Sequence, residues 1–115
     1  MANVFKLKTD TGVGTTLTTI YTVPTSPSTT TIIIGCLLAN IHASAQVNAN
    51  VQIVTAAVSG ENGDDVYLIK SVPVPHGSSL EIVEGKIVMQ AGDIIKISSD
   101  TAASVDVALS VLEQT

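Results

Sequence analysis

Several residue types are scarce in this 115-residue chain, and each scarcity excludes a class of partner. The chain contains no arginine and no tryptophan, and its aromatic residues are two tyrosines and one phenylalanine. Binding to DNA or RNA needs clustered cations, and single strands also need aromatic side chains on which bases stack. The five lysines are scattered along a chain of net charge −5. We therefore expect neither a nucleic acid nor an anionic membrane surface as a partner.

Cysteine and long apolar runs are also scarce. Cys36 is the only cysteine, so no disulfide can form within the chain, and no oxidising compartment is required. The longest purely apolar run, residues 32–39, is far shorter than the roughly 20 residues of a membrane-spanning helix. The first residues lack a basic segment followed by an apolar one, so we expect no secretory signal. We expect the protein to be synthesised in the cytoplasm.

What the chain has in abundance is β-branched residues: threonine, valine and isoleucine make up 41 of its 115 positions. Such side chains fit a pleated sheet better than a helix. Strict alternation of apolar and polar residues over 46–53, and a similar alternation over 104–111, indicates strands with one buried face. With the turn-forming segments between them, the pattern predicts an all-β, single-domain β-sandwich of jelly-roll or immunoglobulin type, with eight or nine strands.

The strand pattern is less clear in the N-terminal residues than in the rest of the chain. Residues 13–115 are expected to form the sandwich, whereas residues 1–12 fit either an edge strand or an arm that leaves the body. Residues 29–42 are apolar on both faces, which indicates a central strand or one covered by a partner, and Gly35 within them predicts a bulge or bend. Glu84-Gly85 predicts a tight hairpin between residues 79–83 and 86–90.

No group of residues carries a recognisable catalytic pattern. His42 and His76 have no metal-ligand spacing, and Cys36 lies in the most apolar stretch, where burial suppresses thiolate formation. The acidic segment 61–65 has a composition that Ca²⁺ sites use but not the ligand pattern of an EF-hand, so a solvated turn is the preferred interpretation. We therefore predict no enzyme activity, no catalytic residue, no cofactor and no metal site.

The surface is the remaining candidate for function. A sandwich with few charges and a two-faced apolar strand has apolar area to cover, and self-association covers both that area and the sheet edges. We accordingly expect a homo-oligomer. The predicted contact residues lie in the N-terminal segment and in the apolar strand: Val4, Phe5, Leu7, Ile32, Ile33 and Ile34.

Two segments of the chain together resemble a known class of proteins. The first is residues 19–24 (TIYTVP), and the second runs from residues 67–70 (YLIK) through 74–81 (VPHGSSLE) to the closing 109–113 (LSVLE). The second segment also includes residues 85–88 (GKIV) and 91–96 (AGDIIK). This pattern of strands and turns resembles small virion structural proteins of tailed bacteriophages, especially those of cyanobacteria and marine bacteria.

The resemblance implies a β-sandwich accessory protein of the virion. A capsid cement or decoration role is the first choice, with the major capsid protein or other virion proteins as partners, and trimers are the arrangement that the resemblance favours. Neck, tail, baseplate and fibre roles are alternatives within the virion. A cellular β-sandwich binding module and a metal-dependent enzyme of cupin-like shape are the rival classes.

Overall fold

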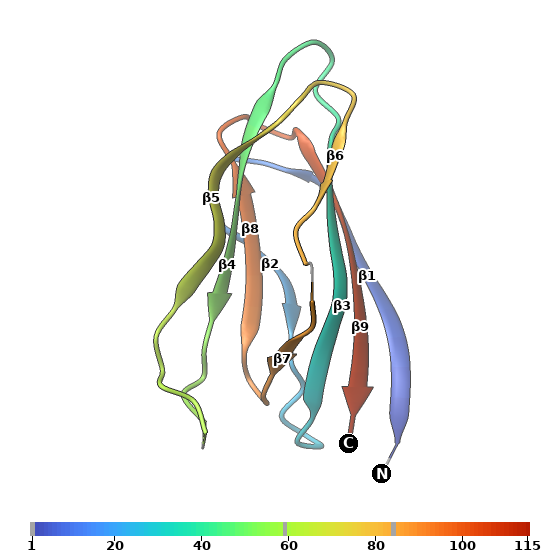
Figure 1. Ribbon diagram of the computed structural model, residues 1–115, viewed down its shortest axis with the longest axis vertical. Coiled ribbons are helices and arrows are strands. Elements are labelled where there is room, and N and C mark those ends of the chain that lie inside the picture. The colour runs from blue at the N-terminus through green and yellow to red at the C-terminus, as the bar shows by residue number, and fades with distance from the viewer. Residues whose placement is uncertain (1, 59, 84) are drawn as a thin grey trace.

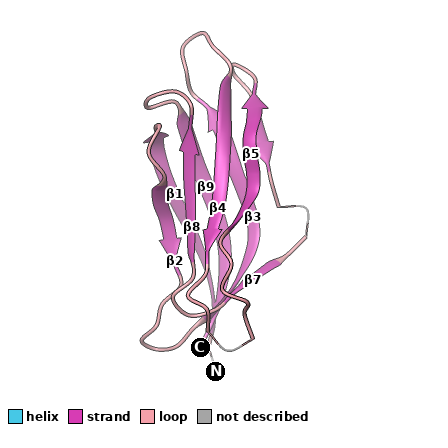
Figure 2. Cartoon of the chain, turned by 90° about the vertical axis from the view of Figure 1, so that its left-hand side faces the viewer, coloured by secondary structure: helices cyan, strands magenta, loops and turns pink. Residues whose placement is uncertain are grey.

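The computed structural model describes residues 2–58, 60–83 and 85–115 as two antiparallel sheets packed face to face (Figures 1 and 2). The β1 sheet contains β1 (Asn3–Val13), β9 (Val105–Gln114), β3 (Thr30–Asn40), β6 (Ser79–Glu81) and β7 (Ile87–Met89). The β2 sheet contains β2 (Thr18–Thr22), β8 (Ile94–Ser99), β4 (Val47–Val54) and β5 (Val66–Val74). The predicted all-β sandwich is confirmed. The described residues form no helix that is long and apolar enough to cross a bilayer.

The strand order identifies the sandwich as a jelly roll. Strand β1 pairs with β9, β2 with β8, β3 with β6 and β7, and β4 with β5, all antiparallel. A chain folded back on itself at the β4–β5 connection and then rolled up gives these pairs, with β6 and β7 sharing the place of one strand. Both termini therefore lie at the same end of the molecule, where Ala2 and Thr115 exchange backbone hydrogen bonds (Figure 1).

The core lies between the two sheets and follows the alternation in the sequence. In β9 the buried apolar residues are Val105, Val107, Leu109 and Val111, and in β4 they are Val47, Ala49 and Val51. Each residue in these sets is two positions from the next, because successive side chains of a strand point to opposite faces. The sheet faces that point away from the core are left to solvent or to a partner.

The central strand β3 contains the predicted bulge at Gly35. Its pairing with β9 shifts between Ile33 and Gly35, so the buried positions change from odd numbers before the bulge to even numbers after it. This change of phase is why the sequence is apolar on both faces. Glu81 fills the bulge, since its carboxylate accepts the backbone N–H of Cys36 at 2.8 Å and lies where a side chain at position 35 would be.

The predicted hairpin at Glu84-Gly85 is wrong. Strands β6 and β7 both pair antiparallel to β3, one beside residues 37–39 and the other beside residues 31–33, so they run in the same direction along β3. Residues 82 and 83 continue the chain along β3 instead of reversing it, and Val83 is buried in the core. Glu84 itself lies outside the described residues.

Candidate interaction surface

The outer face of the β1 sheet carries a row of apolar side chains that crosses four strands. Phe5 of β1 lies opposite Leu112 of β9, Leu112 lies opposite Ile32 of β3, and Ile32 lies opposite Val88 of β7. Directly paired residues point to the same face of a sheet, so these four side chains, here called the apolar row, form one continuous line. Val111, Ile33 and Met89, which neighbour Leu112, Ile32 and Val88 in their strands, are buried in the core, and this places the apolar row on the outside.

The ends of the apolar row are open to solvent. Phe5 is 73% exposed and Val88 is 56% exposed, while Leu112 and Ile32 between them are partly exposed. Leu7 extends the surface along β1 at 64% exposure, and Ile34 and Leu37 extend it along β3. Single exposed apolar residues are normal, but a contiguous apolar surface on one sheet face is typical of a protein-contact site.

The structure divides the six predicted contact residues. Phe5, Leu7, Ile32 and Ile34 lie on the outer face of the β1 sheet, and Val4 is 44% exposed at the rim of the inner face. Ile33 is fully buried and therefore belongs to the core, so its prediction as a contact residue is wrong. The reason is the two-residue period of β3, which turns the side chain between Ile32 and Ile34 inward.

Strand β1 also presents an open backbone edge. The Ala2–Thr115 pair exchanges both of its backbone hydrogen bonds, and the register to β9 is unbroken from Asn3 to Asp10. Hydrogen-bonded and non-hydrogen-bonded pairs alternate in antiparallel strands. The even-numbered residues of β1 therefore bond to β9, whereas the N–H and C=O groups of the odd-numbered residues face away from the sheet. Residues 3–12 of the N-terminal segment, expected as either an edge strand or an arm, therefore lie in this edge strand.

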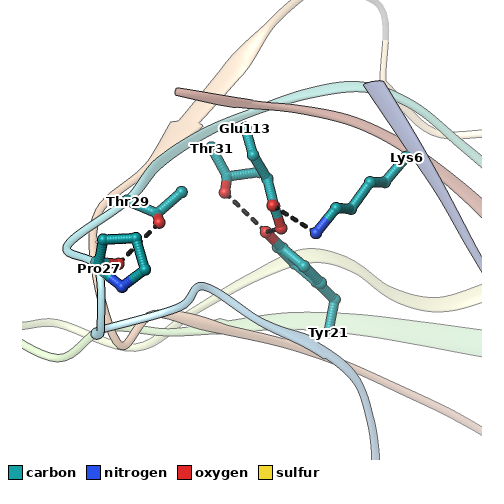
Figure 3. A network of polar contacts seen from close by, with 6 residues as sticks. All are labelled: Lys6, Tyr21, Pro27, Thr29, Thr31 and Glu113. Atoms are coloured by element: carbon teal, nitrogen blue, oxygen red, sulfur yellow. Dashed lines mark hydrogen bonds and ion pairs between the residues drawn. The ribbon is translucent and has the colours of Figure 1, made fainter. Parts of the chain in front are cut away.

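A polar network fastens the inner face of this edge strand to both sheets (Figure 3). The Nζ atom of Lys6 lies 2.8 Å from Glu113 Oε1, and the Tyr21 hydroxyl donates to Glu113 Oε2 at 2.5 Å. The Thr31 hydroxyl lies 2.8 Å from the same phenol oxygen. These residues come from β1, β9, β2 and β3, so one buried carboxylate connects the two sheets.

The network fixes the protonation states of its members. Burial raises the pKa of Tyr21, and its hydrogen bond to the Glu113 carboxylate raises it further, so the phenol stays a donor. Burial acts to raise the pKa of Glu113 as well, but the Lys6 ammonium and the Tyr21 hydroxyl outweigh burial and hold that pKa below its usual value. Glu113 is therefore a carboxylate at neutral pH, held for structural reasons.

The unit formed by Tyr21, Thr31 and Glu113 was not predicted from the sequence, and neither was the exposure of Leu112 and Val88 on the surface. Part of the signal was available, because Glu113 continues the inward-facing positions of 105–111 and a charge at such a position needs a buried partner. Tyr21, which donates to Glu113, lies 92 positions away in the chain, and the two residues come together only through the jelly-roll pairing.

The residues considered for chemistry lie in ordinary structural environments. The Nδ1 atom of His42 accepts the backbone N–H groups of Ser44 and Ala45, and His76 lies in an exposed turn. Cys36 is fully buried, and burial together with the nearby Glu81 charge raises the pKa of its thiol to about 12. Among the described residues, no three histidine, cysteine, aspartate or glutamate side chains are grouped as metal ligands.

The acidic loop is held by hydrogen bonds within the chain. Glu61 Oε1 accepts the Thr55 hydroxyl at 3.0 Å and the Val58 backbone N–H at 3.1 Å. The carboxylate of Asp65 accepts the backbone N–H of Thr55 at 3.0 Å. These carboxylates therefore organise the connection between β4 and β5.

Comparison with known proteins gives a likeness in fold. No protein-family model matches the chain, and no curated protein matches it in sequence. A solved structure from work on Bacillus endospore appendages, described as a novel family of disulfide-linked pili, is similar with a TM-score of 0.50 and 17% sequence identity. The match covers 99% of this chain and 87% of the other. At this identity the likeness concerns the β-sandwich fold.

Proposed function

We propose that this protein is a structural subunit of a larger protein assembly, and that its first role is as a capsid decoration protein of a tailed bacteriophage. The single observation that carries the proposal is the exposed apolar row on the outer face of the β1 sheet. In this proposal the apolar row docks on the major capsid protein and stabilises the shell, and the virion is where the protein resides. Neck, tail, baseplate and fibre positions are the alternatives within the virion, and at each of them the protein would dock through the same apolar row.

The outer face of the β1 sheet gains from burial because Phe5, Leu7 and Val88 expose large apolar side chains on it. Burying apolar surface is favourable by about 25 cal/mol per Å², and the four members of the apolar row are already aligned by the sheet. Ile32 and Val88 lose little freedom on docking, because β-branched side chains are already restricted at χ1. Several copies on one particle then add their modest contacts to strong attachment.

The proposed passive role assigns structural work to the unusual side chains of the interior. Among the buried side chains with shifted pKa values, Tyr21, Asp93 and Glu113 make hydrogen bonds within the chain, and Cys36 lies in the core. A cellular β-sandwich binding module would use the same face, and it remains the more distant alternative.

The fold likeness supports a second candidate, a subunit of a self-assembling filament. The similar protein belongs to pili described as disulfide-linked. In this chain the sole cysteine is fully buried at the centre of β3, so links between subunits through Cys36 would require the core to open. A filament of this protein would therefore be held by noncovalent contacts.

The proposal is tested by replacing Val88 with lysine and Val66 with lysine as the matched control. Both valines are about half exposed, at 56% and 50%, but Val66 lies in β5 of the other sheet. Each purified variant is cosedimented with capsids assembled from the major capsid protein of the same genome. We expect Val88→Lys to lose binding and Val66→Lys to retain it. Wild-type binding by Val88→Lys would contradict docking through the apolar row.

A further inference from the structure

We propose that the free edge of β1 pairs with the β1 strand of a second copy of this chain, joining two β1 sheets into one continuous sheet about a two-fold axis. This dimer deepens the proposed function, because it would present two apolar rows to a partner. Only this use of the dimer rests on the proposed function.

The four sheet edges of the described chain differ in how well they are protected. Strand β2 has five residues and a register shift, β6 and β7 have three residues each, and β5 contains Pro73 and two register shifts. Short length, proline and bulges are the usual devices that stop edge-to-edge pairing. Strand β1 is different, because its 11 residues include no proline and its register is regular from Asn3 to Asp10.

Lysines are another common protection of an edge, but those of β1 are engaged inward. Lys6 forms the ion pair with Glu113, and the Nζ atom of Lys8 lies over the Tyr21 ring, 5.9 Å from its centroid. The outward backbone groups belong to Asn3, Phe5, Leu7 and Thr9, whose neighbouring side chains on the outer face include the exposed Phe5 and Leu7. The edge therefore offers regular hydrogen-bonding groups and apolar side chains together.

A second copy of β1 complements this edge in one antiparallel register. Pairing all four outward residues places Phe5 opposite the partner's Leu7, Leu7 opposite the partner's Phe5, and Asn3 opposite the partner's Thr9. Apolar side chains then face apolar ones and polar side chains face polar ones, and each pair exchanges two backbone hydrogen bonds. The arrangement is isologous, so it closes with two copies.

The charges on the inner face favour this full-overlap register over a register shifted by two residues. In the full-overlap register Lys6 faces the partner's Lys6, and each of these lysines is already paired with its own Glu113. A shift by two residues instead places Lys6 opposite the partner's Lys8, which has no carboxylate within ion-pair distance among the described residues. The shift also places Asn3 opposite Thr11, which lies beyond the regular part of β1, and Phe5 opposite Thr9, so an apolar side chain faces a polar one.

Proline at position 7 tests the inference directly, because it removes an outward N–H without removing a bond between β1 and β9. Leu7→Ala is the matched control, since it shortens the side chain and keeps the N–H. Sedimentation velocity over a range of micromolar concentrations should show a monomer–dimer equilibrium for the wild type. We expect Leu7→Pro to weaken the dimer by roughly tenfold or more, and clearly more than Leu7→Ala does, because each dimer loses two backbone hydrogen bonds.

Amide hydrogen exchange provides a readout that needs no variant. In dilute protein the amides of Phe5 and Leu7 should exchange rapidly while those of Lys6 and Lys8 are protected by β9, and at high concentration this alternation should disappear. If Leu7→Pro does not fold, Thr9→Pro against Thr9→Ala repeats the comparison at another outward N–H.

Three results would overturn the inference: a monomer or a trimer at all concentrations, a dimer in which the Phe5 and Leu7 amides still exchange rapidly, or equal effects of Leu7→Pro and Leu7→Ala. Such a result leaves the proposed function standing if Val88→Lys still abolishes capsid binding. Conversely, a dimer through β1 that does not bind capsids would contradict the proposed function and leave the inference intact.

Discussion

Replacing Glu113 with glutamine removes the charge that connects the two sheets while keeping the shape of the side chain. Glu113 is 6% exposed, and its hydrogen bond from Tyr21 is buried. Hydrogen bonds to charged groups contribute about 1.5–3 kcal/mol, and glutamine retains a neutral acceptor that recovers part of this. The ion pair with Lys6 adds little, because Lys6 is 41% exposed and solvent screens it. We expect Glu113→Gln to lower the free energy of unfolding by about 1–2 kcal/mol at neutral pH.

The cost should depend on pH in a definite direction. The native pKa of Glu113 is held below its usual value, so the stabilisation is complete above the unfolded glutamate pKa of about 4.3 and is lost as the pH falls through the depressed native pKa. The difference between wild type and Glu113→Gln should therefore be constant near neutral pH and should shrink in acid.

Urea unfolding of both proteins across the acid range measures this difference. Asp64→Asn is the matched control, because Asp64 is an exposed acidic residue of the β4–β5 loop, and its replacement should change stability by less than about 0.5 kcal/mol. A cost for Glu113→Gln that stays the same, or grows, as the pH falls would refute the assignment of Glu113 as a stabilising carboxylate.

Two further predictions concern the bulge in β3. A Cβ atom at position 35 would lie 2.8 Å from Glu81 Oε1, so Gly35→Ala should displace that carboxylate from the Cys36 and Val83 amides and cost about 1–3 kcal/mol in thermal unfolding; a wild-type melting temperature would show that the contact is not needed. The Cys36 thiol, buried and with its pKa raised to about 12, should resist iodoacetamide at neutral pH in the native protein and react fully in urea. Rapid alkylation without denaturant would argue against this core position.

The sequence predicted the strands whose burial follows one regular period. Strands β4 and β9 keep a single inward face from end to end, so alternation alone identified their buried residues. Strand β3 was harder, because the bulge at Gly35 changes which face points inward and leaves consecutive apolar residues that alternation cannot separate. This is why Ile33 was grouped with its exposed neighbours.

Other features depend on contacts between distant parts of the chain. Glu84-Gly85 has the chemistry of a hairpin turn, but β3 offers pairing positions on both sides of it, and long-range pairing decided the direction of the chain. The apolar row joins residues 5, 112, 32 and 88, and only the register of four strands brings them into line. Its two ends, Phe5 and Val88, come from segments that local patterns treat as unrelated.

The most direct test of the account is an electron cryomicroscopy map of native particles in which this chain is traced. We predict that another protein subunit covers Phe5, Leu112, Ile32 and Val88 on the outer face of the β1 sheet. A map in which this face is bare to solvent, while the protein is attached through the β2 sheet or is missing from every assembly, would contradict the central claim.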